Sequence, residues 1–150
     1  MKLVRNSVFE TNSSSCHSIS VGKSDVYLGF TPNDENKIVL PPREFGWENE
    51  THSDVESRLV YVWIYIRDWT GSSRDTFLEM YKKVVFEHTG ADGISMKCHT
   101  TTWGVDEGYI DHQSVESGDL HDLFDSESRL KSFLFGRDSC IETGNDNGDY

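Results

Sequence analysis

Basic residues are scarce in this chain of 150 residues. It holds 14 Lys and Arg against 26 Asp and Glu, which gives a formal net charge of −12 at pH 7. A protein that grips nucleic acid by neutralising phosphates needs a surface rich in Lys and Arg, and attraction to an anionic membrane needs the same. The shortage of bases therefore disfavours both kinds of direct binding.

Long hydrophobic runs are also missing. No apolar stretch reaches the roughly 18–20 residues that span a bilayer, and the first residues contain no apolar segment of signal-peptide length. Aromatic residues make up 12% of the chain, which argues against a disordered polypeptide. We expect a soluble protein that folds as one domain over residues 1–150 and acts in the cytoplasm.

Paired cysteines and known catalytic signatures are absent from the sequence. The three cysteines, Cys16, Cys98 and Cys140, form no CxxC pair, which fits a reducing compartment. The sequence contains no GxSxG, Walker A, HExxH or GxGxxG motif. It therefore predicts no particular reaction, no cofactor and no metal site.

The acids concentrate in the last third of the chain. Residues 101–150 carry 12 acids and 3 bases, and no Lys or Arg lies between Lys97 and Arg129. Such a run is either a solvated face or a surface that imitates nucleic-acid phosphates and enters a partner's basic cleft. The residues expected to contact such a partner are Asp106, Glu107, Glu116, Asp119, Asp122 and Asp125.

Local patterns predict an α+β fold with a small, mostly antiparallel sheet and about three helices. Ser53 begins a capping-box pattern ahead of an apolar helix over residues 59–69, and a second, amphipathic helix runs from about Phe77 to Gly90. Asp125 is the expected cap of a last helix that ends at Gly136.

The expected strands are short. They are residues 8–9, 19–21, 37–40 and 140–143, with a hairpin of residues 94–103 and 108–111. Residues 143–150 read either as a flexible, turn-rich tail or as a polar loop that folds back onto a site.

A polar, titratable segment near the start is the first candidate site. Asn12, Ser13, Ser14, Ser15 and His17 follow one another closely between two apolar pieces. Hydroxyls and backbone N–H groups in such a loop can hold an anion, and His17 could act as a general base. An ordinary serine-rich loop that satisfies its own backbone is the alternative.

Two further segments could complete this site. Tyr109, Asp111 and His112 lie at a predicted strand end, and Asn145 and Asp146 lie near the C-terminus. If the three segments meet in one pocket, His17, His112 and Asp111 would be the catalytic candidates. The other residues, namely Asn12, Ser13, Ser14, Ser15, Tyr109, Asn145 and Asp146, would bind the ligand.

The string VFETNSSS at residues 8–15, followed by His17 and Ser18, resembles the opening of a group of small uncharacterised proteins of tailed phages and prophages. The segments at residues 44–48, 109–114 and 143–147 are similar to parts of the same group. In that group the position of Cys16 tends to be Ser or Thr, which favours the Ser and His positions over a Cys16 nucleophile. The resemblance implies a phage-type accessory protein in the infected cytoplasm and implies no reaction.

Two functions are favoured at this point, and a structural or virion-associated role is also open. The first is an acidic accessory protein that binds and inhibits a host or defence protein with a basic surface, by imitating nucleic acid. The second is an enzyme or small-ligand binder, such as a hydrolase or transferase that acts on a phosphate-bearing small molecule. Convergence of the three polar segments would favour the second, and a single acidic face would favour the first.

Overall fold

A computed structural model describes residues 15–46, 49–102, 104–110 and 117–145. In these residues the chain forms four α-helices and nine short strands, an α+β fold as predicted. The helices are α1 (Val55–Trp69), α2 (Arg74–Thr89), α3 (Ser117–Asp122) and α4 (Glu127–Phe135), with 3₁₀ turns η1 (Gly71–Ser73) and η2 (Leu123–Asp125). The strands are β1 (Ser15–Ser20), β2 (Lys37–Leu40), β3 (Glu44–Phe45), β4 (Glu50–His52), β5 (Gly93–Met96), β6 (His99–Thr101), β7 (Gly104–Asp106), β8 (Tyr109–Ile110) and β9 (Cys140–Asn145).

Helix α1 is the centre of the core. Its sequence is nearly all apolar, and it is buried along most of its length against α2, α4, β2 and β8. The helix begins one residue later than its capping pattern predicted, because the Asp54 carboxylate, and not the Ser53 hydroxyl, accepts the Ser57 N–H at 2.9 Å. The same hydrogen bond lowers the pKa of Asp54, against an opposing effect of burial.

The outer helices also follow local signals. Helix α2 ends where predicted, at Gly90, whose φ of 80° is the left-handed conformation that glycine adopts without strain. Helix α4 begins with Ser126 as its N-cap, one residue after the predicted Asp125, which lies in η2. Helix α3 was not expected, because its six residues are too few to show a periodic pattern.

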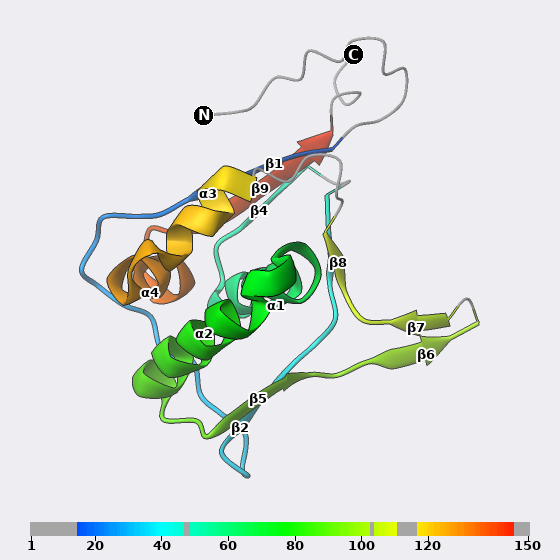
Figure 1. Ribbon diagram of the computed structural model, residues 1–150, viewed down its shortest axis with the longest axis horizontal. Coiled ribbons are helices and arrows are strands. Elements are labelled where there is room, and N and C mark those ends of the chain that lie inside the picture. The colour runs from blue at the N-terminus through cyan, green and yellow to red at the C-terminus, as the bar shows by residue number, and fades with distance from the viewer. Residues whose placement is uncertain (1–14, 47–48, 103, 111–116, 146–150) are drawn as a thin grey trace.

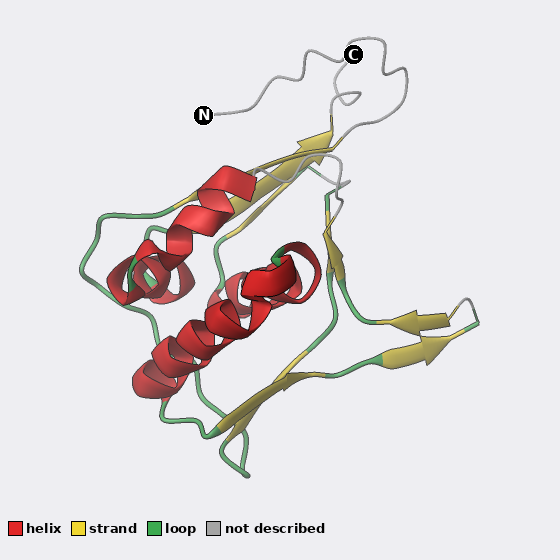
Figure 2. Cartoon of the chain, in the orientation of Figure 1, coloured by secondary structure: helices red, strands yellow, loops and turns green. Residues whose placement is uncertain are grey.

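The strands form separate small sheets around the helices (Figure 2). Strand β9 is the middle of a sheet of order β1-β9-β4, in which both pairs are antiparallel. Strands β2 and β5 form a parallel pair, as do β3 and β8. The predicted tail is corrected in part, because Thr143–Asn145 belong to this middle strand and are paired with β1.

The hairpin predicted over residues 94–111 is also different in the structure. Strand β5 ends at Met96, and a shorter hairpin of β6 and β7 follows it. Figure 1 shows this hairpin projecting away from the body. Strand β8 then returns to pair with β3, a segment far away in the chain, which no local pattern could indicate.

A buried arginine joins three parts of the fold. Arg58 of α1 is fully buried, and its guanidinium donates hydrogen bonds to three backbone carbonyls, those of Ser53 at 2.8 Å, Phe133 at 3.0 Å and Gly136 at 2.7 Å. Burial lowers the pKa of Arg58. This side chain therefore stands in for the missing hydrogen-bond donors at the C-terminal end of α4.

Candidate functional site

The end of the serine-rich segment lies beside the C-terminal strand. Ser15, Cys16 and His17 of β1 face Asn145, Gly144 and Thr143 of β9 across an antiparallel ladder. Two of the three segments predicted to share a site are therefore neighbours. Apart from Tyr109, the remaining members of that predicted set lie outside the described residues; they are Asn12, Ser13, Ser14, Asp111, His112 and Asp146.

Tyr109, from the third predicted segment, lies on β8 opposite Glu44 of β3. A short connection leads from β3 to β4, and β4 pairs with β9. The rings of Phe45 and His52 meet edge to face at 5.2 Å across this connection. Yet the groove that Tyr109 lines is completed by residues of α1 and of the β7–β8 segment. Convergence of all three segments in one pocket stays a prediction.

The acidic stretch does not form one continuous face among the described residues. Asp106 ends β7, whereas Asp122 ends α3 and Asp125 lies in η2. Figure 1 places β7 and α3 on opposite sides of the molecule. Glu116 lies outside the described residues, and of Asp119 only its place in α3 is described. The predicted contact surface is thus divided into two acidic areas.

One of these areas is a groove at the base of the projecting hairpin, with a volume of about 670 Å³. We call it the acidic groove. Four of its lining residues are acids and one is an arginine. Its lining residues are Glu44, Arg67, Asp68, Gly104, Val105, Asp106, Glu107, Gly108 and Tyr109.

Arg67 holds the groove together rather than offering a free positive charge. It hydrogen-bonds Asp68 through two nitrogens, each at 2.8 Å, and donates to the carbonyl oxygens of Glu107 at 2.5 Å and Gly108 at 3.0 Å. The hydrogen bonds to Asp68 raise the pKa of Arg67. The guanidinium is therefore fully occupied by the groove's own floor.

The other carboxylates remain available to a partner. Within the described part of the chain, Glu44, Asp106 and Glu107 form no salt bridge, and Asp106 only accepts the Gly108 N–H at 3.1 Å. Two apolar side chains stand beside them, since Val105 is 57% and Tyr109 is 45% exposed. An exposed tyrosine among carboxylates is a composition typical of a protein-binding surface.

Gly108 is required by the backbone of this groove. Its φ is 82°, and a Cβ there would lie 2.9 Å from Ile64 Cδ1 and 3.2 Å from the Arg43 carbonyl oxygen. We expect Gly108→Ala to cost about 1–3 kcal/mol in urea unfolding, because left-handed strain and crowding add. Gly71→Ala is the matched control, since its φ is 54° with no atom within 4 Å. Equal losses in the two variants would contradict the close approach at Gly108.

Glu44, Arg67 and Asp68 were not predicted from the sequence to be part of a binding site. Arg67 and Asp68 lie in the last turn of an apolar helix, where two adjacent charged residues normally indicate only a solvent-exposed helix end. The only local signal is the pair of glycines that flanks Val105, Asp106 and Glu107. No cluster of three His, Cys, Asp or Glu in the described ranges is arranged to hold a metal ion.

Comparison with known proteins adds no relative. The chain matches no protein-family model, no curated protein and no solved structure. Within the described ranges, no helix has both the length and the hydrophobicity to span a membrane.

Proposed function

We propose that the protein is an acidic accessory protein that binds and inhibits a partner with a basic surface, and that the acidic groove is the contact. The observation that carries the proposal is the combination of three carboxylates that form no salt bridge in the described part of the chain with the exposed Val105 and Tyr109. Carboxylates steer and align a basic partner, while the apolar side chains supply area that loses water on contact.

The groove suits an arginine or lysine of a partner better than a metal or a free nucleic acid. Its carboxylates are spread over β3, α1 and the β7–β8 segment instead of converging on one point. The Tyr109 ring can also pack against a guanidinium by a cation–π contact. A partner that fits this groove must present a basic surface, and basic clefts are typical of proteins that bind nucleic acid. The inhibited partner is therefore proposed to be a nucleic-acid-binding host or defence protein in the infected cytoplasm.

The test compares two charge reversals of equal size. In the groove variant, Glu44→Lys is combined with Glu107→Lys. Asp106 is left unchanged, because its carboxylate accepts the Gly108 N–H. In the control variant, Asp122→Lys is combined with Asp125→Lys on the opposite side of the molecule. Both variants change the net charge by the same amount, so only the location differs.

Tagged wild-type protein and both variants are used to capture partners from a bacterial host lysate at low and at high salt. We expect one stoichiometric nucleic-acid-binding partner that is released by salt, lost with the groove variant and kept with the control. Like charges placed in the contact should weaken binding about a hundredfold or more. Equal retention by wild type and the groove variant, or loss only with the control, would overturn the assignment.

A further inference from the structure

A second cavity, between the end of β1 and helix α4, has the opposite electrostatic character. Its volume is about 510 Å³. Two cations, three serines and two apolar side chains line it. The lining residues are Ile19, Val21, Gly22, Lys23, Ser126, Ser128, Arg129 and Ser132.

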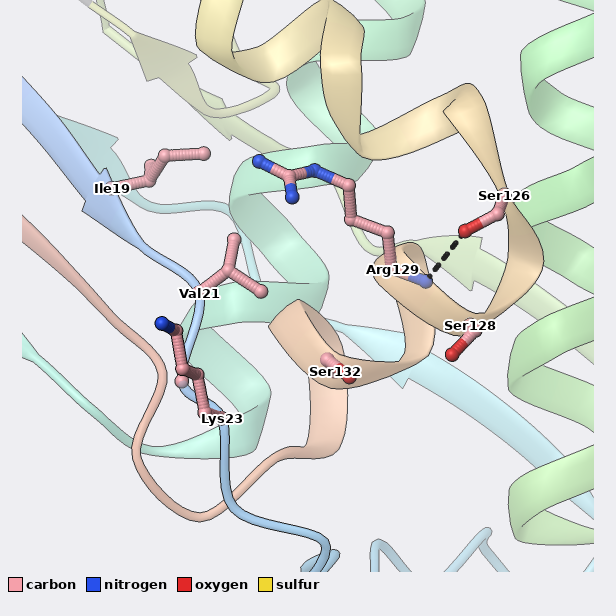
Figure 3. Close-up of a pocket in the computed structure, with 8 residues that line it drawn as sticks. Ile19, Val21, Lys23, Ser126, Ser128, Arg129 and Ser132 are labelled. Carbon is pink, nitrogen blue, oxygen red and sulfur yellow. Dashed lines mark hydrogen bonds between the residues drawn. The ribbon is translucent and has the colours of Figure 1, made fainter.

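The two cations come from separate segments that face each other. Figure 3 shows the guanidinium of Arg129 directed from α4 toward Ile19, with Val21 between Arg129 and Lys23. No carboxylate in the described part of the chain forms a salt bridge with either cation. The other cationic side chains there that lack a hydrogen bond, salt bridge or cation–π contact are those of Lys82 and Lys97.

This arrangement is unusual for a protein with so large an excess of acids. Most of its described cations are held by a carboxylate, a backbone carbonyl or an aromatic ring, as with Lys37, Arg43 and Lys131. Two unneutralised cations that share a cavity repel each other, and a bound anion would remove that repulsion.

The walls of the cavity are held in place by hydrogen bonds. The Gly22 N–H donates to Ser139 Oγ at 2.9 Å, and that hydroxyl donates to the Ser132 carbonyl at 2.6 Å. Ser139 is fully buried. A Cβ on Gly22 would lie only 2.5 Å from Asp138 Cβ, so the segment after β1 approaches the loop between α4 and β9 as closely as glycine permits. The Asp138 carboxylate itself is exposed and pairs with Arg137.

Serine hydroxyls add further hydrogen-bond donors to this cavity. Ser126 Oγ accepts the Arg129 N–H at 3.0 Å as the helix cap, and its own O–H is still a donor. Ser128 and Ser132 bring two more hydroxyl donors to the cavity. A guanidinium, an ammonium and several hydroxyl groups are the donors that bind phosphate, the first by its planar fork and the second as a point charge.

We propose that this cavity binds a phosphate-bearing small molecule with an apolar or aromatic part. The Arg129 guanidinium and the Lys23 ammonium, on either side of Val21, would attract the phosphate, and the apolar part would pack on Ile19 and Val21. The volume is in the range of small-ligand pockets. This site is separate from the acidic groove, so it stands or fails independently of the proposed function.

The probes are phenyl phosphate, inorganic phosphate and phenol, each titrated into the full-length ¹⁵N-labelled protein and followed by amide chemical shifts. We expect phenyl phosphate to cause saturating shifts at residues 19–23 and 126–132. It should bind at least about threefold more tightly than inorganic phosphate, because the ring covers apolar surface. Phenol alone should cause no saturating shift there.

The decisive variant is Lys23→Gln with Arg129→Gln, and the matched control is Lys82→Gln with Lys97→Gln. Both remove two positive charges from side chains without described partners. We expect phenyl phosphate affinity to fall about tenfold or more in the first variant and to stay unchanged in the second. Equal losses would mean non-specific charge attraction, and no saturating shift in wild type would mean that no such site exists. Either result overturns the proposal.

Unchanged amide spectra of both variants outside the cavity serve as the folding check. The groove variant, Glu44→Lys with Glu107→Lys, should keep its phenyl phosphate affinity. A failure of partner capture thus leaves the phosphate proposal standing, and the reverse also holds.

Discussion

Replacing Arg58 with methionine should lower the free energy of unfolding by roughly 3–5 kcal/mol. The guanidinium is fully buried and donates to the carbonyls of Ser53, Phe133 and Gly136. Methionine fills a similar volume and removes all three donors. The acceptors belong to the backbone and stay in place, so they lose their partners in a site that water does not reach.

This arginine differs from a buried ion pair, which apolar residues can often replace at little cost. In a pair, both charges leave together, whereas here only the donor can be removed. Arg137→Met is the matched control, because Arg137 is 60% exposed and its salt bridge in the described part of the chain is to Asp138 at 3.5 Å. Arg137→Met should lower the free energy of unfolding by no more than about 0.5 kcal/mol.

Urea unfolding at neutral pH measures both variants. If Arg58→Met loses no more unfolding free energy than Arg137→Met, the three carbonyls find other partners and Arg58 does not stabilise the fold. Arg58→Lys should lose an intermediate amount of unfolding free energy, because a lysine ammonium reaches fewer of the carbonyls than the planar guanidinium of arginine does.

Alkaline pH should destabilise the protein through its buried tyrosines. Tyr61 and Tyr81 are almost completely buried, and burial raises the pKa of each phenol well above its usual range near 10. The Tyr81 hydroxyl also donates to the Leu59 carbonyl at 2.8 Å. The folded state therefore keeps both phenols protonated at a pH where the unfolded chain releases the protons.

The direction of the effect follows from this difference. Both groups have a raised folded pKa, so their contribution is intact below pH 10 and is lost as the pH rises above it. Each group should cost about 1 kcal/mol between pH 10 and pH 11 and about 1.4 kcal/mol per further pH unit, until its folded pKa is reached. The pair should thus remove about 2 kcal/mol over the first unit.

Urea unfolding at pH 9, 10 and 11 measures this loss, and phenolate absorbance reports which tyrosines ionise before unfolding. The double variant Tyr61→Phe with Tyr81→Phe should start less stable at neutral pH, because Tyr81 loses its hydrogen bond. Its stability should then fall less steeply above pH 10. Parallel curves for the variant and the wild type would show that other groups cause the alkaline loss.

Where local patterns were strong, the sequence predicted the structure well. The apolar run before Trp69, the spacing from Phe77 to Val85 and the stop at Gly90 all led to the helices that are observed. These signals involve residues within one or two turns of each other. The caps at Asp54 and Ser126 were each missed by one residue, because several neighbouring side chains are all good caps and only the folded backbone selects among them.

The strands were harder to predict, since their partners are distant in the chain. Tyr109 and Ile110 pair with Glu44 and Phe45 in parallel, and β5 pairs with β2 instead of continuing into the hairpin. Parallel pairing has no turn signal, and two-residue strands have too few side chains to show alternation.

The sequence by itself determined the excess of acids, the shortage of cations and the helices that form the core. Only the tertiary structure decided where those charges act. It divided the acidic stretch between two sides of the molecule and brought Glu44 and Asp68 beside Asp106 and Glu107. It also brought Lys23 and Arg129 to the lining of one cavity. The net charge of a chain does not depend on where its charged residues lie. A binding site does depend on this, because it needs residues that only long-range packing brings close together.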